Sequence, residues 1–180
     1  MNKIKTLITL TVLAMSVTPG WAGLTKFTVL NKKVSFDVPS DWQTVNKDVG
    51  IPLKLLGPIY EDQRPVLLFV PVDLKNEKLV LDDKTKAEES YKLSRLAWLQ
   101  QFNGKSITFL PLKTFTTDGK KIEIHQFGHL YIFNNVNLEE KSYYINCKKE
   151  TFHIKTLIQV EHIEKWAPTM NKMIESFRCE

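Results

Sequence analysis

The most constraining feature of the sequence is a change of hydrophobic period near its C-terminal end. In residues 152–160, FHIKTLIQV, apolar and polar residues alternate, which is typical of a strand with one buried face. In the segment WAPTMNKMIESF, the apolar residues recur at helical spacing: Trp166, Met170, Met173, Ile174 and Phe177. A strand that covers one face, followed at once by an amphipathic helix, predicts that the two pack together in an α+β domain.

The first 22 residues have the pattern of a secretory signal peptide. Two lysines precede a short apolar run, and small residues suited to cleavage after Ala22 follow it. The run is about a dozen residues long, too short for a helix that spans a hydrocarbon core of about 30 Å. We therefore expect a mature domain over residues 23–180 that is periplasmic or secreted and has no transmembrane segment; an uncleaved anchor is the alternative.

The two cysteines, Cys147 and Cys179, both lie in the expected mature part. An export signal together with an even cysteine count favours one disulfide in an oxidising compartment. Closing a loop of about 33 residues would stabilise the fold by about 3–4 kcal/mol through the unfolded state. The sequence has no C-x-x-C pair, which argues against a redox-active site.

A second helix is expected over residues 85–102, which contain no Pro or Gly. Asp82 and Asp83 are candidates for its N-cap, and Asn103 and Gly104 should end it. The expected buried side carries Tyr91, Trp98 and Phe102, with Leu96, Ala97 and Leu99 beside them. The expected solvent side carries Lys86, Glu88, Glu89, Lys92 and Arg95.

The rest of the chain is expected to form strands, at 27–30, 34–39, 65–73, 106–116, 121–133 and 139–147. The continuous apolar run 65–73 predicts a central strand covered on both faces. Pro52, Gly57 and Pro58 predict that 51–60 is irregular or an edge strand. Trp42 is expected to plug one end of the core, with an exposed binding anchor as the alternative.

No pattern in the sequence indicates catalytic, cofactor-binding or metal-binding residues. Glu123, His125 and His129 share one face of a strand, but the two histidines should lie about 13 Å apart, too far for one zinc ion. His153 and His162 are expected to be solvated or to cap a helix. There is no G-x-S-x-G or glycine-rich phosphate loop. The lysine-rich trios at 31–33, 119–121 and 147–149 are dispersed, which argues against nucleic-acid binding.

The order of the expected elements resembles the PsbP-like superfamily, which includes the PsbP subunit of photosystem II, Mog-type import factors and DcrB-like proteins. FDVPSDW at 36–42, the Pro-interrupted IPLKLL segment at 51–56 and IESF at 174–177 carry the resemblance. It implies a central, mainly antiparallel sheet flanked by helices, an α/β/α sandwich, over residues 23–180. It also implies a non-enzymatic binding or assembly role, and no family motif assigns binding residues to particular positions here.

Three functions therefore remain open. The leading hypothesis is an exported, non-catalytic binding or assembly module of the cell envelope, which recognises a protein partner through the outer sheet surface or through residues 43–65. An immunity protein that neutralises a secreted toxin is the second hypothesis. The third, an enzyme with a dispersed site, requires a deep polar pocket that contains strongly perturbed titratable groups.

Overall fold

The computed structural model describes residues 21–29, 32–48, 50–72, 83–117, 122–147 and 150–180. The strands are β1 (Trp21–Val29), β2 (Lys32–Pro39), β3 (Gln43–Asp48), β4 (Ile51–Leu56), β5 (Val66–Val70), β6 (Lys105–Thr116), β7 (Glu123–Phe133), β8 (Val136–Cys147), β9 (Glu150–Gln159) and β10 (Arg178–Cys179). The helices are α1 (Lys84–Gln101) and α2 (Ile163–Glu175), with a short 3₁₀ turn, η1 (Val160–His162), before α2. Residues 1–20 of the expected signal peptide, the N-cap candidate Asp82 and most of the lysine-rich trios lie outside the described residues.

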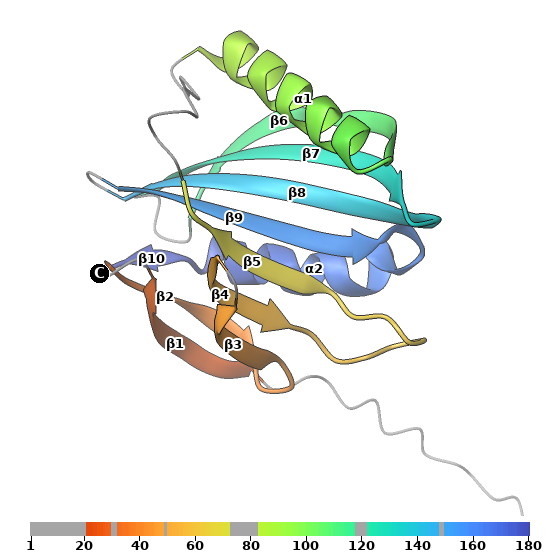
Figure 1. Cartoon of the computed structure of the whole chain (residues 1–180). Coiled ribbons are helices and arrows are strands. Elements are labelled where there is room, and N and C mark those ends of the chain that lie inside the picture. Colours follow the sequence, from red (N-terminus) through yellow and green to blue (C-terminus); the bar gives the residue numbers. More distant parts are fainter. Residues whose placement is uncertain (1–20, 30–31, 49, 73–82, 118–121, 148–149) are drawn as a thin grey trace, which may run out of the picture.

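Seven strands form one antiparallel sheet in the order β3-β4-β5-β9-β8-β7-β6, and three form a smaller sheet in the order β1-β2-β10 (Figure 1). Helix α1 packs on one face of the large sheet, where Tyr91 stacks on Phe127 of β7. Helix α2 and the small sheet cover the opposite face, to which Tyr143 of β8 points. The structure thus has the predicted α+β class, with a central antiparallel sheet flanked by helices.

The main core lies between the large sheet and the layer formed by α2 and β2. The apolar residues predicted to face the core from the C-terminal helix are buried there. Each of them is at most 1% exposed: Met170, Met173, Ile174 and Phe177. Trp42, at 7% exposure, joins this core as the expected plug. The closing strand and helix therefore hold the two sheets together, as the change of period predicts.

Helix α1 is placed as predicted but is rotated relative to the expected buried side. Asp83 caps its start by accepting from the Lys86 backbone N–H at 3.2 Å, and Asn103 ends it with φ 56°. The prediction that Leu96, Ala97 and Phe102 are buried was wrong, since all three are exposed. Arg95, expected on the solvent side, is only 7% exposed because it packs under the helix against β8.

Two strand predictions need correction. The segment 51–60 was predicted to be irregular or an edge, yet β4 is a regular interior strand, because β3 pairs along its other side. Strand β5 was predicted to be covered on both faces. Its burial alternates instead: Leu67 and Phe69 are buried in the main core, whereas the residues between them are half-buried.

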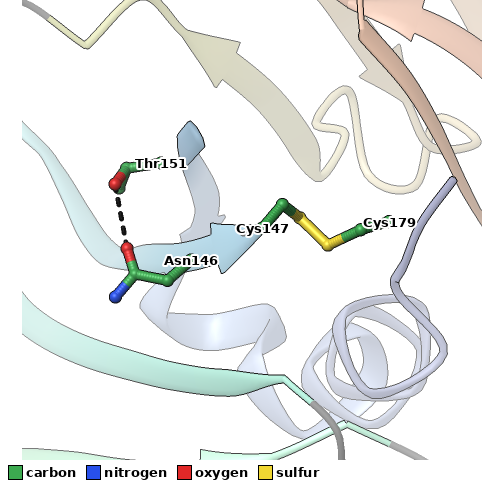
Figure 2. The surroundings of a disulfide bond; sticks show 4 residues. All are labelled: Asn146, Cys147, Thr151 and Cys179. Atoms are coloured by element: carbon green, nitrogen blue, oxygen red, sulfur yellow. Dashed lines mark hydrogen bonds between the residues drawn. A yellow bond between two sulfur atoms is a disulfide. The ribbon is translucent and has the colours of Figure 1, made fainter. Parts of the chain in front are cut away.

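The predicted disulfide joins Cys147, the last residue of β8, to Cys179 of β10 (Figure 2). The two Cα atoms lie 5.7 Å apart across a sequence separation of 32 residues. Beside the bridge, the Thr151 hydroxyl donates to Asn146 Oδ1 at 2.9 Å, which links the neighbouring ends of β8 and β9 (Figure 2). The bridge fixes the segment after α2 to the large sheet.

Candidate functional site

The connection between β4 and β5 ends in a tight hairpin that presents two apolar side chains to solvent. We call residues 57–65 the hairpin tip. Tyr60 and Gln63 exchange both backbone hydrogen bonds, at 2.7 and 3.0 Å. The two residues between them, Glu61 and Asp62, have φ of 49° and 61°, as a primed two-residue turn requires. Ile59 is 67% exposed and Tyr60 is 39% exposed.

The start of α2 braces the Tyr60 ring. The ammonium of Lys165 lies 2.9 Å from the ring centroid, and the imidazole of His162 meets the ring edge-on at 5.2 Å. Glu61 raises the pKa of the Tyr60 hydroxyl, first through a hydrogen bond between the side chains and then through its charge. Glu61 also lies 3.8 Å from His162. The exposed aromatic ring is thus held in one orientation by charged neighbours.

The base of the hairpin tip is rigid for steric reasons. The Gly57 N–H donates to the Pro65 carbonyl at 2.9 Å. A Cβ on Gly57 would lie 2.4 Å from Pro65 Cγ and 3.1 Å from the buried Trp42 ring, so no larger residue fits without movement. Arg64 donates to the Gln43 side chain on β3 at 3.3 Å. These contacts fix the tip before any partner binds, and such pre-organisation reduces the entropy cost of binding.

A second group of charged residues lies under α1 and is closed to solvent. Glu140 of β8, 3% exposed, accepts from the Arg95 guanidinium at 2.9 Å and lies 3.5 Å from the Lys155 ammonium. The Ser142 hydroxyl donates to the same carboxylate at 3.4 Å. The Arg95 guanidinium also stacks over Trp98, 4.5 Å from the ring centroid. A carboxylate shared by two cations in the interior fixes the register of helix and sheet, and no reactant can reach it.

His125 and His129 are arranged as predicted, on one face of β7, whereas His153 is not. His125 and His129 share the α1 face as expected: His125 lies 3.7 Å from Glu123, and His129 bonds to the Ser106 hydroxyl at 2.9 Å. Among the described residues no group of three or more ligating side chains could hold a metal ion.

His153 was expected on a solvated outer face but is only 3% exposed, stacked on Tyr144. Burial lowers the pKa of His153 to about 3 and that of His129 to about 4. Both rings are therefore neutral packing groups at neutral pH.

Solved structures share this architecture. Cyanobacterial PsbP (CyanoP) from Synechocystis is similar at a TM-score of 0.60 and 10% identity, over 95% of this chain and 99% of that chain. The chain has the PsbP-like fold. LpqN of Mycobacterium tuberculosis, a protein involved in cell envelope biogenesis, has a TM-score of 0.50 and 14% identity over 80% of this chain and 81% of its own.

The Ran-binding protein Mog1p of Saccharomyces cerevisiae is also similar, with a TM-score of 0.45 and 9% identity over 87% of this chain and 95% of its own. In sequence, no protein-family model and no curated protein matches the chain.

Sequence reasoning anticipated only part of the hairpin tip. It placed a candidate recognition segment at 43–65, and the hairpin tip lies in its second half. It missed the tip itself, because Glu61 and Asp62 are not the Asn-Gly or Asp-Gly pair that usually announces such a turn. It also missed Arg95 of α1 and Glu140 of β8, because charged side chains are ordinarily solvated.

Proposed function

We propose that the protein is an exported, non-catalytic binding module of the cell envelope, which recognises a protein partner through the hairpin tip. The observation that best supports this proposal is the pre-formed hairpin tip. Ile59 and Tyr60 are exposed there, on a backbone that is fixed by Gly57 and by the Tyr60–Gln63 pair. Rigid, exposed aromatic and aliphatic side chains surrounded by charges are the usual anchors of protein interfaces.

Two observations support the envelope assignment. The disulfide is of the kind that persists in oxidising compartments. The similar protein LpqN is involved in cell envelope biogenesis. Cleavage after Ala22 would remove only the first two residues of β1 and would leave the paired stretch from Leu24 onward intact. No helix in the described part of the chain is long and apolar enough to cross a membrane.

The non-catalytic assignment is supported by two histidines and two tyrosines with shifted pKa values that lie where a substrate cannot reach them. An enzyme needs its shifted acids and bases at a surface that substrate reaches. His129 and His153, whose pKa values are lowered, are at most 3% exposed and lie beneath α1. Tyr91 and Tyr131, whose pKa values burial raises, line the same sealed layer. These shifts follow from packing.

The test uses site-specific photo-crosslinking in the native envelope. A photoreactive residue at position 59 should give one discrete crosslinked protein, whereas the same residue at position 107 should not. Ile107 is a matched control because it is also an exposed isoleucine, 50% exposed, on β6. Ile59→Ser and Tyr60→Ser should each weaken the purified complex by more than about tenfold, as expected for interface anchors. Equal crosslinking at both positions, or an undiminished complex in the Ile59→Ser/Tyr60→Ser variant, would refute the proposal.

A further inference from the structure

A cavity of about 260 Å³ lies where the last turns of α2 pass over β6, β7 and β8. It is on the face of the large sheet opposite α1, and its position is independent of the hairpin tip. The strands contribute Phe115, Thr116, Gln126 and Tyr143, and α2 contributes Asn171, Ile174 and Glu175. The cavity is smaller than the roughly 300–1,000 Å³ of drug-sized sites, so it suits a ligand of one ring.

The lining combines hydroxyl and amide groups that both donate and accept hydrogen bonds. Each of the side-chain amides of Gln126 and Asn171 carries a donor next to an acceptor, and the hydroxyls of Thr116 and Tyr143 do both. The Tyr143 hydroxyl is fully buried, and the Thr156 side chain of β9 is the hydrogen-bonding neighbour that acts on its pKa. Burial raises the pKa of Tyr143, so this hydroxyl is a neutral donor. The half-buried Phe115 ring and Ile174 add an apolar surface.

The charges around the cavity oppose an anionic ligand. Glu175 forms no ion pair with a described residue, and no basic residue in the described part of the chain lines the cavity, so an anion would meet a negative group there. The carbonyl end of α2, which carries partial negative charge, also opposes an anion. Apart from the Glu175 carboxylate, the polar groups of the lining are uncharged amides and hydroxyls, so hydrogen bonding is expected to determine the ligand more than charge does. Glu139, the other carboxylate that acts on Tyr143, is already paired with Lys141 at 2.9 Å.

We propose that this cavity binds a neutral polyhydroxylated ligand, a single sugar ring of a glycan. Adjacent ring hydroxyls each donate and accept, which matches the paired amide groups of Gln126 and Asn171, while Glu175 accepts from a further hydroxyl. The Phe115 ring supplies a surface for the apolar C–H face of the sugar. Among the described residues one carboxylate lines the cavity, whereas glycoside hydrolysis uses a pair on either side of the bond, so the proposal is one of binding without cleavage.

The experiment titrates the disulfide-bonded protein with glucose, N-acetylglucosamine, agmatine and citrate and follows amide resonances by NMR. A hexose has about a dozen non-hydrogen atoms, so typical binding efficiency per atom places Kd at about 1–10 mM. One of the two sugars should saturate and shift the side-chain NH₂ resonances of Gln126 and Asn171. Asn171→Leu should weaken binding by about tenfold, the effect of losing a pair of hydrogen bonds to the ligand. Asn171 is exposed on α2, so this variant should still fold.

Glu164→Gln is the matched control for Glu175→Gln, because both glutamates are exposed on α2 and only Glu175 lines the cavity. Glu175→Gln should weaken sugar binding by about fivefold, since a charge-assisted hydrogen bond becomes a neutral one, and the control should not change it. Saturation by agmatine or citrate in place of the sugars would overturn the proposal. So would the absence of saturation by either sugar at about 50 mM, well above the expected Kd. Either failure would leave the proposed protein partner at the hairpin tip unaffected.

Discussion

Removing Glu140 should destabilise the protein more than removing Arg95, although the two side chains form one ion pair. Glu140→Gln preserves volume but leaves the Arg95 guanidinium in the interior without its carboxylate, and it also deprives Lys155 of a partner. Breaking a buried pair in this way costs about 3–5 kcal/mol of unfolding free energy. Arg95→Met keeps most of the buried stem and leaves Glu140 beside Lys155 and Ser142. We expect it to cost about 2–3 kcal/mol, because the remaining carboxylate keeps part of its compensation.

The double variant Arg95→Met/Glu140→Gln distinguishes the interaction energy of the ion pair from the cost of leaving one buried charge without its partner. It removes both partners, so its loss should fall below the sum of the single losses by about 2 kcal/mol, the coupling typical of contacting residues in one network. Lys155→Met is the control. Its side chain is 19% exposed and its distance to Glu140 is 3.5 Å, so the loss should stay near about 1 kcal/mol.

Equilibrium unfolding in urea measures these differences, with tryptophan fluorescence as the signal. Trp98 lies directly under the Arg95 guanidinium and should report the opening of this layer. We expect the loss of unfolding free energy to decrease in the order Glu140→Gln, Arg95→Met, Lys155→Met. The slope of the unfolding free energy against urea concentration should not change. A smaller loss for Glu140→Gln than for Arg95→Met, or a double variant that equals the sum of the singles, would refute a shared carboxylate as the centre of the network.

Three further predictions concern other parts of the chain. Replacing Cys147 and Cys179 by serine should lower stability by about 3–4 kcal/mol in calorimetry, from the entropy of a 32-residue separation, and an unchanged melting temperature would contradict it. Because the pKa of His153 in the folded state is lowered to about 3, its contribution to stability is complete above about pH 6.5 and is lost as the pH falls toward 3. His153→Phe should therefore make stability less dependent on acid pH. An unaltered midpoint of acid unfolding would contradict this. Gly57→Ala should cost about 1–3 kcal/mol by overpacking against Pro65, and a neutral effect would show that the base of the hairpin tip is mobile.

The sequence predicts the layers of this fold because its strongest periodic signals come from the main core. The alternation in 152–160 and the helical stripe that includes Met173 and Ile174 reflect one uninterrupted apolar surface, and the structure buries that surface. The cysteine pairing was predictable for a different reason, since two cysteines allow only one internal bridge. The elements that form the main core therefore follow from local pattern.

The layer under α1 was mispredicted because its buried side is partly polar. Periodicity assigns apolar residues to the interior, so Leu96 was placed inside and Arg95 outside. The structure reverses them, because Glu140 on β8 supplies a carboxylate that neutralises the guanidinium. That partner is 45 positions away in the sequence, and no local pattern reports it. His153 was misplaced for the same reason, since its neutral ring packs on Tyr144 like an aromatic residue.

Helix α2 connects the two candidate sites. Its beginning braces the hairpin tip through Lys165, and its end lines the cavity through Asn171 and Glu175. Lys165 is six residues before Asn171 and ten before Glu175, which at about 1.5 Å per residue is about 9–15 Å along α2, so a single sugar ring cannot occupy both sites. The disulfide fixes the chain at Cys179, four residues after the cavity, whereas the hairpin tip is fixed by its own backbone hydrogen bonds. Reduction should therefore loosen the cavity before it affects the tip, so the proposed sugar binding should be sensitive to reduction and the proposed protein recognition should not be.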